Sequence, residues 1–186
     1  MTRRLVLLAG VVRSLRADHT LLVRREGERL RVSAPQIRFL GGRPLEQLRN
    51  GVTVGFVSQV SLFLESQSAV ASRAVDRFIL SFDLWEEKFT ATRMGPPSRS
   101  VSRLTAPAAE AWCLDQSLAL PAGLAPRRRF SIRLELRAED PRETAAVASQ
   151  SGISITRLIE LFSRPPRSQQ PRWTAGAGPL RLEELP

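Results

Sequence analysis

"RFILSFDLWEEKFTATR", residues 77–93, decides the fold. Bulky or small apolar side chains recur at every second position on both sides of "DLWEEK": Phe78, Leu80, Phe82, Phe89 and Ala91. A period of two is the pattern of a strand that buries one face. The charged residues between the two runs are of the kinds that sheets disfavour and turns accept. The stretch therefore predicts two antiparallel strands joined by a hairpin loop at Trp85.

Three other segments have strand patterns. "TLLVRREGERLRVSA", residues 20–34, predicts a hairpin around Glu26-Gly27, because glycine accepts the positive φ of a tight turn. "GVTVGFVSQVSLFLES", residues 51–66, predicts a long strand with one apolar and one polar face. "RRRFSIRLELRAED", residues 127–140, alternates in the same way. We expect a polar loop over residues 66–74, before the opening stretch.

Helical patterns are shorter. "RPLEQLRNG", residues 43–51, predicts a short helix that ends at its Asn-Gly pair. Thr105 and the alanines after it predict a helix over 106–117. A third helix is expected at 154–163, where one apolar stripe repeats at i, i+3, i+4 and i+7. The predicted fold is mainly β (α+β): an antiparallel β-sandwich or strongly curved sheet of about six or seven strands, with one or two covering helices.

The two ends of the chain differ in composition from the body. Residues 1–17 have a basic start, a short apolar run and Ala17, the order of a secretory signal peptide, while a first strand over 5–15 is the alternative. Residues 18–163 form the predicted single β-rich domain. Residues 164–186 are a proline- and arginine-rich tail with too few apolar residues to fold alone, so it is either disordered or docked on the domain.

The formal charge of +10 invites a nucleic-acid interpretation, but its distribution does not favour one. Much of the excess lies near the ends, and the body between them has a surplus of only 4 positive charges. Its arginines are scattered and form no continuous stripe, as a nucleic-acid footprint requires. We therefore expect nucleic acid not to be the partner. No segment has the 18 or more apolar residues of a membrane-spanning helix.

Several catalytic chemistries lack the residues they need. His19 is the only histidine and Cys113 the only cysteine, so neither a multi-histidine metal site nor a cysteine zinc cluster is expected. Cys113 lies on the alanine-rich helix, where a cysteine usually packs as a small apolar residue. Glu86 and Glu87 are adjacent in a loop, where neighbouring side chains point apart instead of facing one another across a cleft. We predict no catalytic residue, metal or cofactor.

The order of these elements resembles a known family. Hairpin, short helix ending in "NG", long strand, "DRFILSFDLWEEKF" hairpin, alanine-rich helix and basic strand follow one another as in the bacterial proteins grouped as domain of unknown function 4390. The resemblance covers about residues 18–138 and includes "SFDLWEEKF", where that family places a turn. It implies a β-rich bacterial protein of the cell envelope, with no known activity, cofactor or catalytic residue.

Two places are candidates for binding a partner protein. Trp85, with Glu86 and Glu87, stands on a predicted hairpin, where an aromatic side chain is a good anchor. The other is the apolar stripe of the helix expected at 154–163, which covers its own domain or docks into a partner's groove. Its members are Ile155, Leu158, Ile159 and Phe162.

The predicted function is a non-catalytic, envelope-associated binding or accessory domain whose partner is another protein. Its expected location is the periplasm or cell envelope if residues 1–17 are a signal peptide. It would be cytoplasmic if residues 1–17 are not a signal peptide. One alternative is an arginine-rich, cytoplasmic nucleic-acid-binding protein, which would bind with a steep salt dependence. A second alternative is a carrier that holds an apolar ligand between sheet and helix. The sequence alone leaves the partner and the oligomeric state open.

Overall fold

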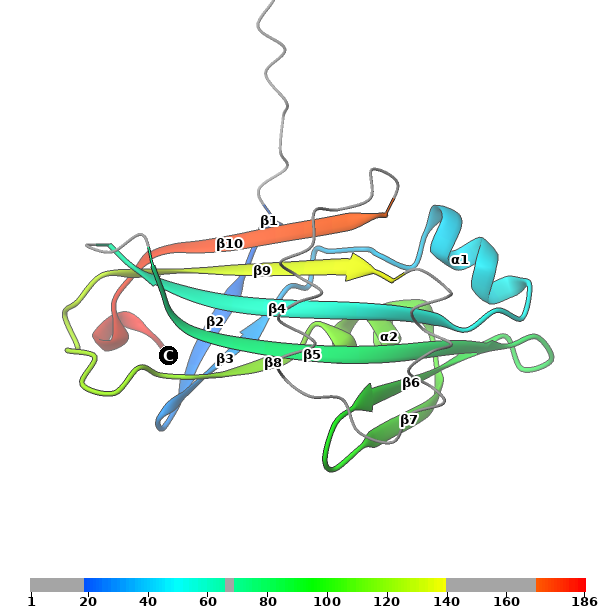
Figure 1. Ribbon diagram of the computed structural model, residues 1–186, viewed down its shortest axis with the longest axis horizontal. Coiled ribbons are helices and arrows are strands. Elements are labelled where there is room, and N and C mark those ends of the chain that lie inside the picture. Colours follow the sequence, from blue (N-terminus) through cyan, green and yellow to red (C-terminus); the bar gives the residue numbers. More distant parts are fainter. Residues whose placement is uncertain (1–18, 66–68, 140–169) are drawn as a thin grey trace, which may run out of the picture.

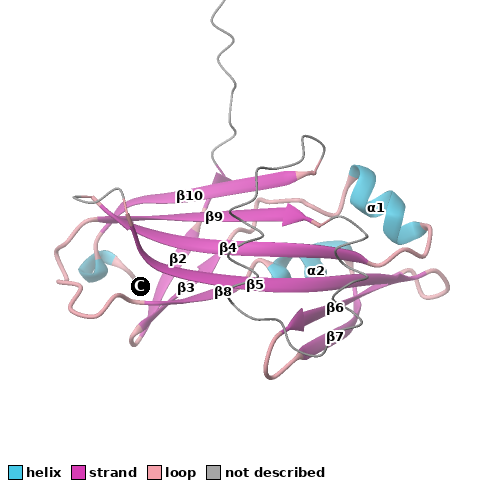
Figure 2. Cartoon of the chain, viewed as in Figure 1, coloured by secondary structure: helices cyan, strands magenta, loops and turns pink. Residues whose placement is uncertain are grey.

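The computed structural model describes residues 19–65, 69–139 and 170–186. They form two β-sheets that pack face to face, with α1 (Gly42–Arg49) at one end and α2 (Ala106–Cys113) behind the long strands (Figure 1). Strands dominate the described chain (Figure 2), and all but one pair of neighbouring strands are antiparallel. The predicted mainly β, sandwich-like α+β fold is confirmed.

The larger sheet has seven strands in the order β1-β10-β9-β4-β5-β6-β7. Its pairs are antiparallel, except that β1 runs parallel to β10. The strands are β1 (His19–Thr20), β4 (Val54–Leu64), β5 (Val70–Asp83), β6 (Lys88–Met94), β7 (Arg99–Leu104), β9 (Phe130–Ala138) and β10 (Arg172–Leu180). The long hairpin of β5 and β6 is the one that residues 77–93 predict.

The smaller sheet lies behind the long strands in Figure 1 and has the order β2-β3-β8. β2 (Leu22–Glu26) and β3 (Arg29–Ser33) form the hairpin expected over residues 20–34. The third strand, β8 (Gln116–Ala119), occupies part of a segment predicted to be helical. That prediction is wrong beyond residue 113, because Gln116 and Leu118 are buried in alternation where β8 pairs with β3.

The two helices are short. α1 (Gly42–Arg49) follows the expected pattern and buries Leu48. α2 (Ala106–Cys113) begins after Thr105, whose backbone carbonyl accepts a hydrogen bond from the N–H of Ala109 at 2.9 Å. α2 packs against β6, and its Ala109 and Cys113 are fully buried.

The core lies between the two sheets. Alternate residues of β4, β5 and β9 face Leu30, Val32 and Leu118 of the smaller sheet, and these side chains have almost no exposure. Fully burying a side chain of this size stabilises the fold by about 1.5–3 kcal/mol. The core side chains of the three long strands include Phe56, Val60, Leu62, Phe78, Leu80, Leu134 and Leu136.

β5 is longer than the sequence predicts. A polar loop was expected over residues 66–74, but the strand begins at Val70 and pairs with β4 from there. β4 extends to Leu64, and its backbone groups require hydrogen-bonding partners along that length. The polar residues Ser72 and Arg73 provide them, opposite Leu62 and Ser61. Backbone pairing therefore outweighs the polar composition of this segment.

β4 is buried on both faces, whereas its pattern predicts one exposed face. Val57 and Ser61, on the side away from the core, are 0% and 3% exposed. On the same side, Arg77 of β5 donates to Glu139 Oε2 from Nε at 2.8 Å, and both side chains are almost fully buried. A buried ion pair of this kind is costly to break, because the remaining charge stays buried without the group that neutralises it here.

The C-terminal segment belongs to the sheet. Of the two alternatives for this tail, docking is the one observed, since β10 pairs with β9 over residues 172–180. Trp173 lies against Phe39 and Phe56 of the core, with ring centroids 6.0 and 6.4 Å away. At Gly178, where φ is 140°, a Cβ would come within 2.8 Å of Ser131 Cβ, so the strand requires glycine there. The signal-like residues 1–17 and the helix expected at 154–163 lie outside the described residues.

Candidate protein-binding site at the β5–β6 hairpin

The turn between β5 and β6, residues 84–87, is fixed by hydrogen bonds from its own backbone. Asp83 Oδ1 accepts hydrogen bonds from the N–H groups of Glu86 at 3.0 Å and Trp85 at 2.8 Å. These two donors stabilise the carboxylate and hold the pKa of Asp83 below its usual range. An aspartate that bonds the backbone two and three residues ahead stabilises a turn directly.

Two further features hold the turn in place. Glu87 has a φ of 52°, the left-handed conformation that closes the turn, and the following residue, Lys88, pairs with Asp83. Glu86 Oε2 lies 3.5 Å from Arg103 Nε on β7, which ties the turn to the neighbouring strand. The backbone of the turn is therefore a defined structure.

This fixed turn presents large apolar side chains to solvent. Trp85 is 96% exposed and Leu84 is 57% exposed. The other two tryptophans differ: Trp112 packs on Phe78, with ring centroids 5.8 Å apart, and Trp173 packs on Phe39. An exposed tryptophan on a rigid support is the kind of residue that carries binding energy at protein interfaces.

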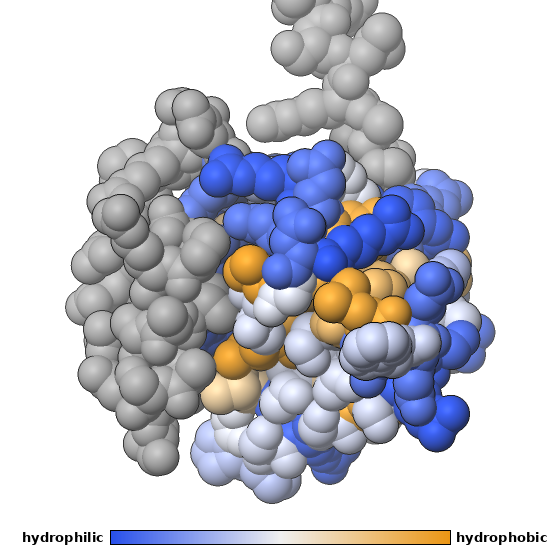
Figure 3. Space-filling view, turned by 90° about the vertical axis from the view of Figure 1, so that its right-hand side faces the viewer, coloured by the Kyte–Doolittle hydropathy of each residue, from blue (hydrophilic) through white to orange (hydrophobic). Residues whose placement is uncertain are grey.

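An open hollow of about 620 Å³ lies beside the turn. Phe82 and Phe89 line it, with their rings 4.7 Å apart, and α1 and the start of α2 contribute the opposite walls. Figure 3 looks at this end of the molecule and shows apolar patches with polar residues above and to the right of them. The lining residues are Leu45, Arg49, Phe82, Leu84, Glu87, Phe89, Thr105 and Ala106. We call the turn and this hollow together the tip site.

Each sequence-predicted site residue of the hairpin has a distinct place. Trp85 projects from the turn, Glu86 bonds to Arg103, and Glu87 lines the hollow. The structure therefore brings these three predicted residues to one site. Sequence reasoning missed the residues that α1 and α2 add, Leu45, Arg49, Thr105 and Ala106, because only the packing of the helices places them beside the hairpin. The predicted helix residues Ile155, Leu158, Ile159 and Phe162 lie outside the described residues.

The carboxylates of the turn are not arranged as a catalytic pair. Asp83 accepts two backbone N–H groups, and Glu86 is directed to Arg103. Within residues 19–65, 69–139 and 170–186, no group of three or more histidine, cysteine, aspartate or glutamate side chains is placed to hold a metal ion. Cys113 is fully buried, and its burial raises the pKa of the thiol to about 12, so it remains a thiol near neutral pH.

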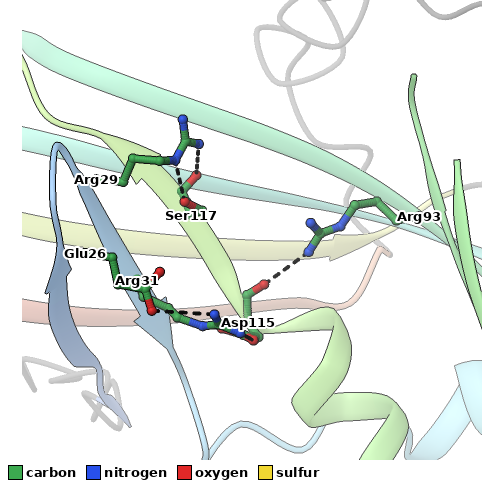
Figure 4. A network of polar contacts seen from close by, with 6 residues as sticks. All are labelled: Glu26, Arg29, Arg31, Arg93, Asp115 and Ser117. Carbon is green, nitrogen blue, oxygen red and sulfur yellow. Dashed lines mark hydrogen bonds and ion pairs between the residues drawn. The ribbon is translucent and has the colours of Figure 1, made fainter. Parts of the chain in front are cut away.

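Several arginines away from the tip site contact other residues of the fold. On the outer side of the smaller sheet, Arg31 forms an ion pair with Asp115 that uses both carboxylate oxygens, and Arg29 bonds to Ser117 (Figure 4). These contacts link β3 to the segment that follows α2. In the basic sequence at 127–129, Arg127 lies 3.4 Å from Glu183, and Arg129 lies 3.6 Å from Glu65.

A second cluster, around Arg93, was not predicted. Its guanidinium lies over the rings of Phe78 and Trp112, at 5.4 and 5.7 Å, and donates to the carbonyl of Asp115 at 3.1 Å. Burial raises the pKa of the neighbouring Asp76, and the charge of Arg93 opposes that shift. Arg93 shares its parity on β6 with Phe89 and Ala91, and this is the sequence signal that could have predicted its place on the inner face. Its contacts join α2 and β8 to the larger sheet.

Comparisons of the chain with protein-family models, curated proteins and solved structures found no match. Among the described residues, no helix is both long enough and apolar enough to cross a membrane. The tip site therefore has to be interpreted from its own geometry.

Proposed function

We propose that this protein is a non-catalytic binding domain that engages a protein surface through the tip site. The observation that carries the proposal is Trp85, 96% exposed on a turn that Asp83 holds by two hydrogen bonds. Because the backbone of the turn is already ordered, binding costs less conformational entropy than it would for a flexible loop, so more of the burial of Trp85 contributes to affinity. Leu84 and the hollow next to it extend the apolar contact.

The polar groups of the tip site suit a protein partner. Arg49 and Glu87, one charge of each sign, line the hollow. This arrangement, with apolar residues at the centre and charges at the border, is the usual anatomy of a protein–protein interface. Loss of an anchor such as Trp85 typically costs at least about 2 kcal/mol of binding free energy.

Site-specific photo-cross-linking in the cells that produce the protein tests this function. A photoreactive side chain at position 85 should give one adduct of defined mass, whereas the same group at Val101, an exposed apolar residue of β7, should not. Excess unlabelled protein should compete for the adduct, and Trp85→Ala protein should not. Equal adducts at both positions, or none at position 85, would contradict the proposal. An adduct removed by nuclease would instead support nucleic-acid binding.

We also propose that the protein is located in the bacterial cell envelope. This location is supported by the signal-like order of residues 1–17 and by the resemblance of residues 18–138 to domain of unknown function 4390. The intact mass of the native protein from fractionated cells tests it. A chain that begins near Asp18 in an envelope fraction is the expected result, and a full-length chain in the cytosol would contradict it.

A second candidate function, carriage of an apolar ligand, is favoured by another hollow. It has a volume of about 320 Å³ and lies between the β2–β3 hairpin and α2. Leu22 and Leu114 line it, with Arg24 as a charged group that would suit an acidic head. Binding of a fluorescent fatty acid that Leu22→Asp abolishes would support this function, and no binding by the wild-type protein would exclude it.

A further inference from the structure

The tip site combines a projection with a hollow. Leu84 and Glu87 line the hollow, but Trp85, between them in the chain, is 96% exposed and projects away from the fold. The projecting ring and the hollow therefore lie side by side on one surface. This surface has the two complementary shapes that a symmetric contact with a copy of itself requires.

A twofold symmetric interface has to be self-complementary: if one residue contacts a second across it, the second contacts the first across the axis. A ring next to a hollow meets that condition, because each copy can place Trp85 in the hollow of the other. The apolar side chains of Leu45, Phe82 and Phe89 would surround the ring. The hydroxyl of Thr105, which makes no capping hydrogen bond to α2, is an acceptor for the indole N–H.

The charges at the border of the hollow are also self-complementary. One acid, Glu87, and one base, Arg49, line it, and neither takes part in an ion pair among the described residues. A twofold arrangement can set each glutamate opposite the arginine of the other copy. The two pairs would make the contact itself neutral, although the chain as a whole has a formal charge of +10. Opposite charges at matching positions favour this orientation over others.

We propose that the protein which occupies the tip site is a second copy of this chain, in a twofold dimer with each Trp85 in the hollow of the other copy. This inference rests on the proposed function, since it names the partner of the same site. One turn and one hollow on each side make a small contact, so the dimer is weak and forms in a concentration-dependent way. Trp85 is its main anchor, and Arg49 with Glu87 sets its geometry.

Sedimentation equilibrium of the full-length chain over a wide concentration range tests this dimer. The wild-type protein should pass from monomer to dimer. Trp85→Ala should weaken the association by at least about 30-fold for each ring that is lost, and a twofold dimer loses two. Arg49→Glu and Glu87→Arg should each weaken it, because each sets like charges opposite one another. The double variant, with the charges exchanged, should restore the dimer to within about threefold of wild type. Circular dichroism confirms that each variant is folded.

Three results would overturn the dimer: a wild-type chain that stays monomeric, a dimer that Trp85→Ala leaves unchanged, or a double variant that associates no better than the single ones. The cross-linking experiment separates this failure from that of the proposed function. An adduct at position 85 with a different protein, together with a monomeric chain, would refute the dimer and retain the binding site. Absence of any adduct at position 85 would refute both.

Discussion

The interior of the sandwich and the tip of the β5–β6 hairpin use aromatic side chains in opposite ways. Trp112 and Trp173 pack against phenylalanines of the core, whereas Trp85 is almost fully exposed. All three lie on or beside well-ordered strands and helices. The difference is that burial of the first two contributes to folding, whereas the apolar surface of Trp85 is available to a partner. Changes in the interior should therefore alter stability, and changes at the tip should alter binding.

Phe56→Ala should have the largest effect on stability. Phe56 is fully buried between Phe39 and Trp173, and its removal would leave a cavity at the centre of the core. We expect a loss of about 3–5 kcal/mol in the free energy of unfolding. Denaturation in urea measures it. A loss below about 1 kcal/mol would show that this part of the core is not closely packed.

Glu139→Ala should have the next largest effect. It would leave the guanidinium of Arg77 buried without the carboxylate that accepts from its Nε and Nη2. Breaking a buried ion pair in this way typically costs about 3–5 kcal/mol. The control is Glu183→Ala, which removes the exposed partner of Arg127 and should cost less than about 1 kcal/mol. Equal losses for the two variants would contradict the structural role of the buried pair.

Asp83→Ala should loosen the tip without unfolding the sandwich. The variant removes the acceptor for the backbone N–H groups of Trp85 and Glu86, so their hydrogen exchange should accelerate. Asp83→Asn retains an acceptor oxygen and should have a smaller effect. Exchange measured by NMR distinguishes the two variants, and unchanged exchange in Asp83→Ala would contradict the role of this carboxylate.

Acid should act on the same turn. The folded-state pKa of Asp83 is below the ordinary value of 3.8, so its contribution to stability is fully present above that value. The contribution is lost as the pH falls through the folded-state pKa, when the carboxylate becomes protonated. The protection of the Trp85 amide against exchange, relative to the intrinsic exchange rate at each pH, should therefore fall as the pH falls through the folded-state pKa of Asp83. The Asp83→Asn variant should lack this step.

Trp85→Ala should have the smallest effect on stability. The ring is 96% exposed, and a surface substitution of this kind changes the free energy of unfolding by no more than about 0.5 kcal/mol. The same substitution should remove most of the binding. A matched measurement on Trp112→Ala, which removes a ring packed on Phe78 and Arg93, should show a clear loss of stability instead. Comparable losses of stability for the two tryptophans would contradict the division between interior and tip.

Local patterns in the sequence predict much of this fold, since alternation identifies β4, β6 and β9 and the turn at Trp85. They fail where pairing partners decide the structure. The polar residues 70–74 join β5 because β4 extends beside them, and Gln116–Ala119 becomes a strand because β3 offers its edge. The docking of β10 on β9 joins segments distant in the sequence, so the low apolar content of the tail gave no sign of it.

The candidate site was predictable in part for the same reason. Trp85, Glu86 and Glu87 belong to one hairpin, so a local pattern places them together. The hollow is formed by the hairpin, α1 and α2, whose residues are distant in the sequence, and the periodicity of each segment says nothing about the others. Arg49 and Glu87 can be recognised as opposite charges of one site only once α1 and the hairpin are known to lie side by side.

Hydroxyl-radical footprinting of the three tryptophans in intact cells and in dilute purified protein tests the central claim most directly. In dilute protein, Trp85 should be oxidised much faster than Trp112 and Trp173, because it alone of the three is almost fully exposed. In cells, oxidation of Trp85 relative to the other two should fall several-fold, since a bound protein covers it. The same ratio in cells and in dilute solution would contradict a protein-binding site at the tip.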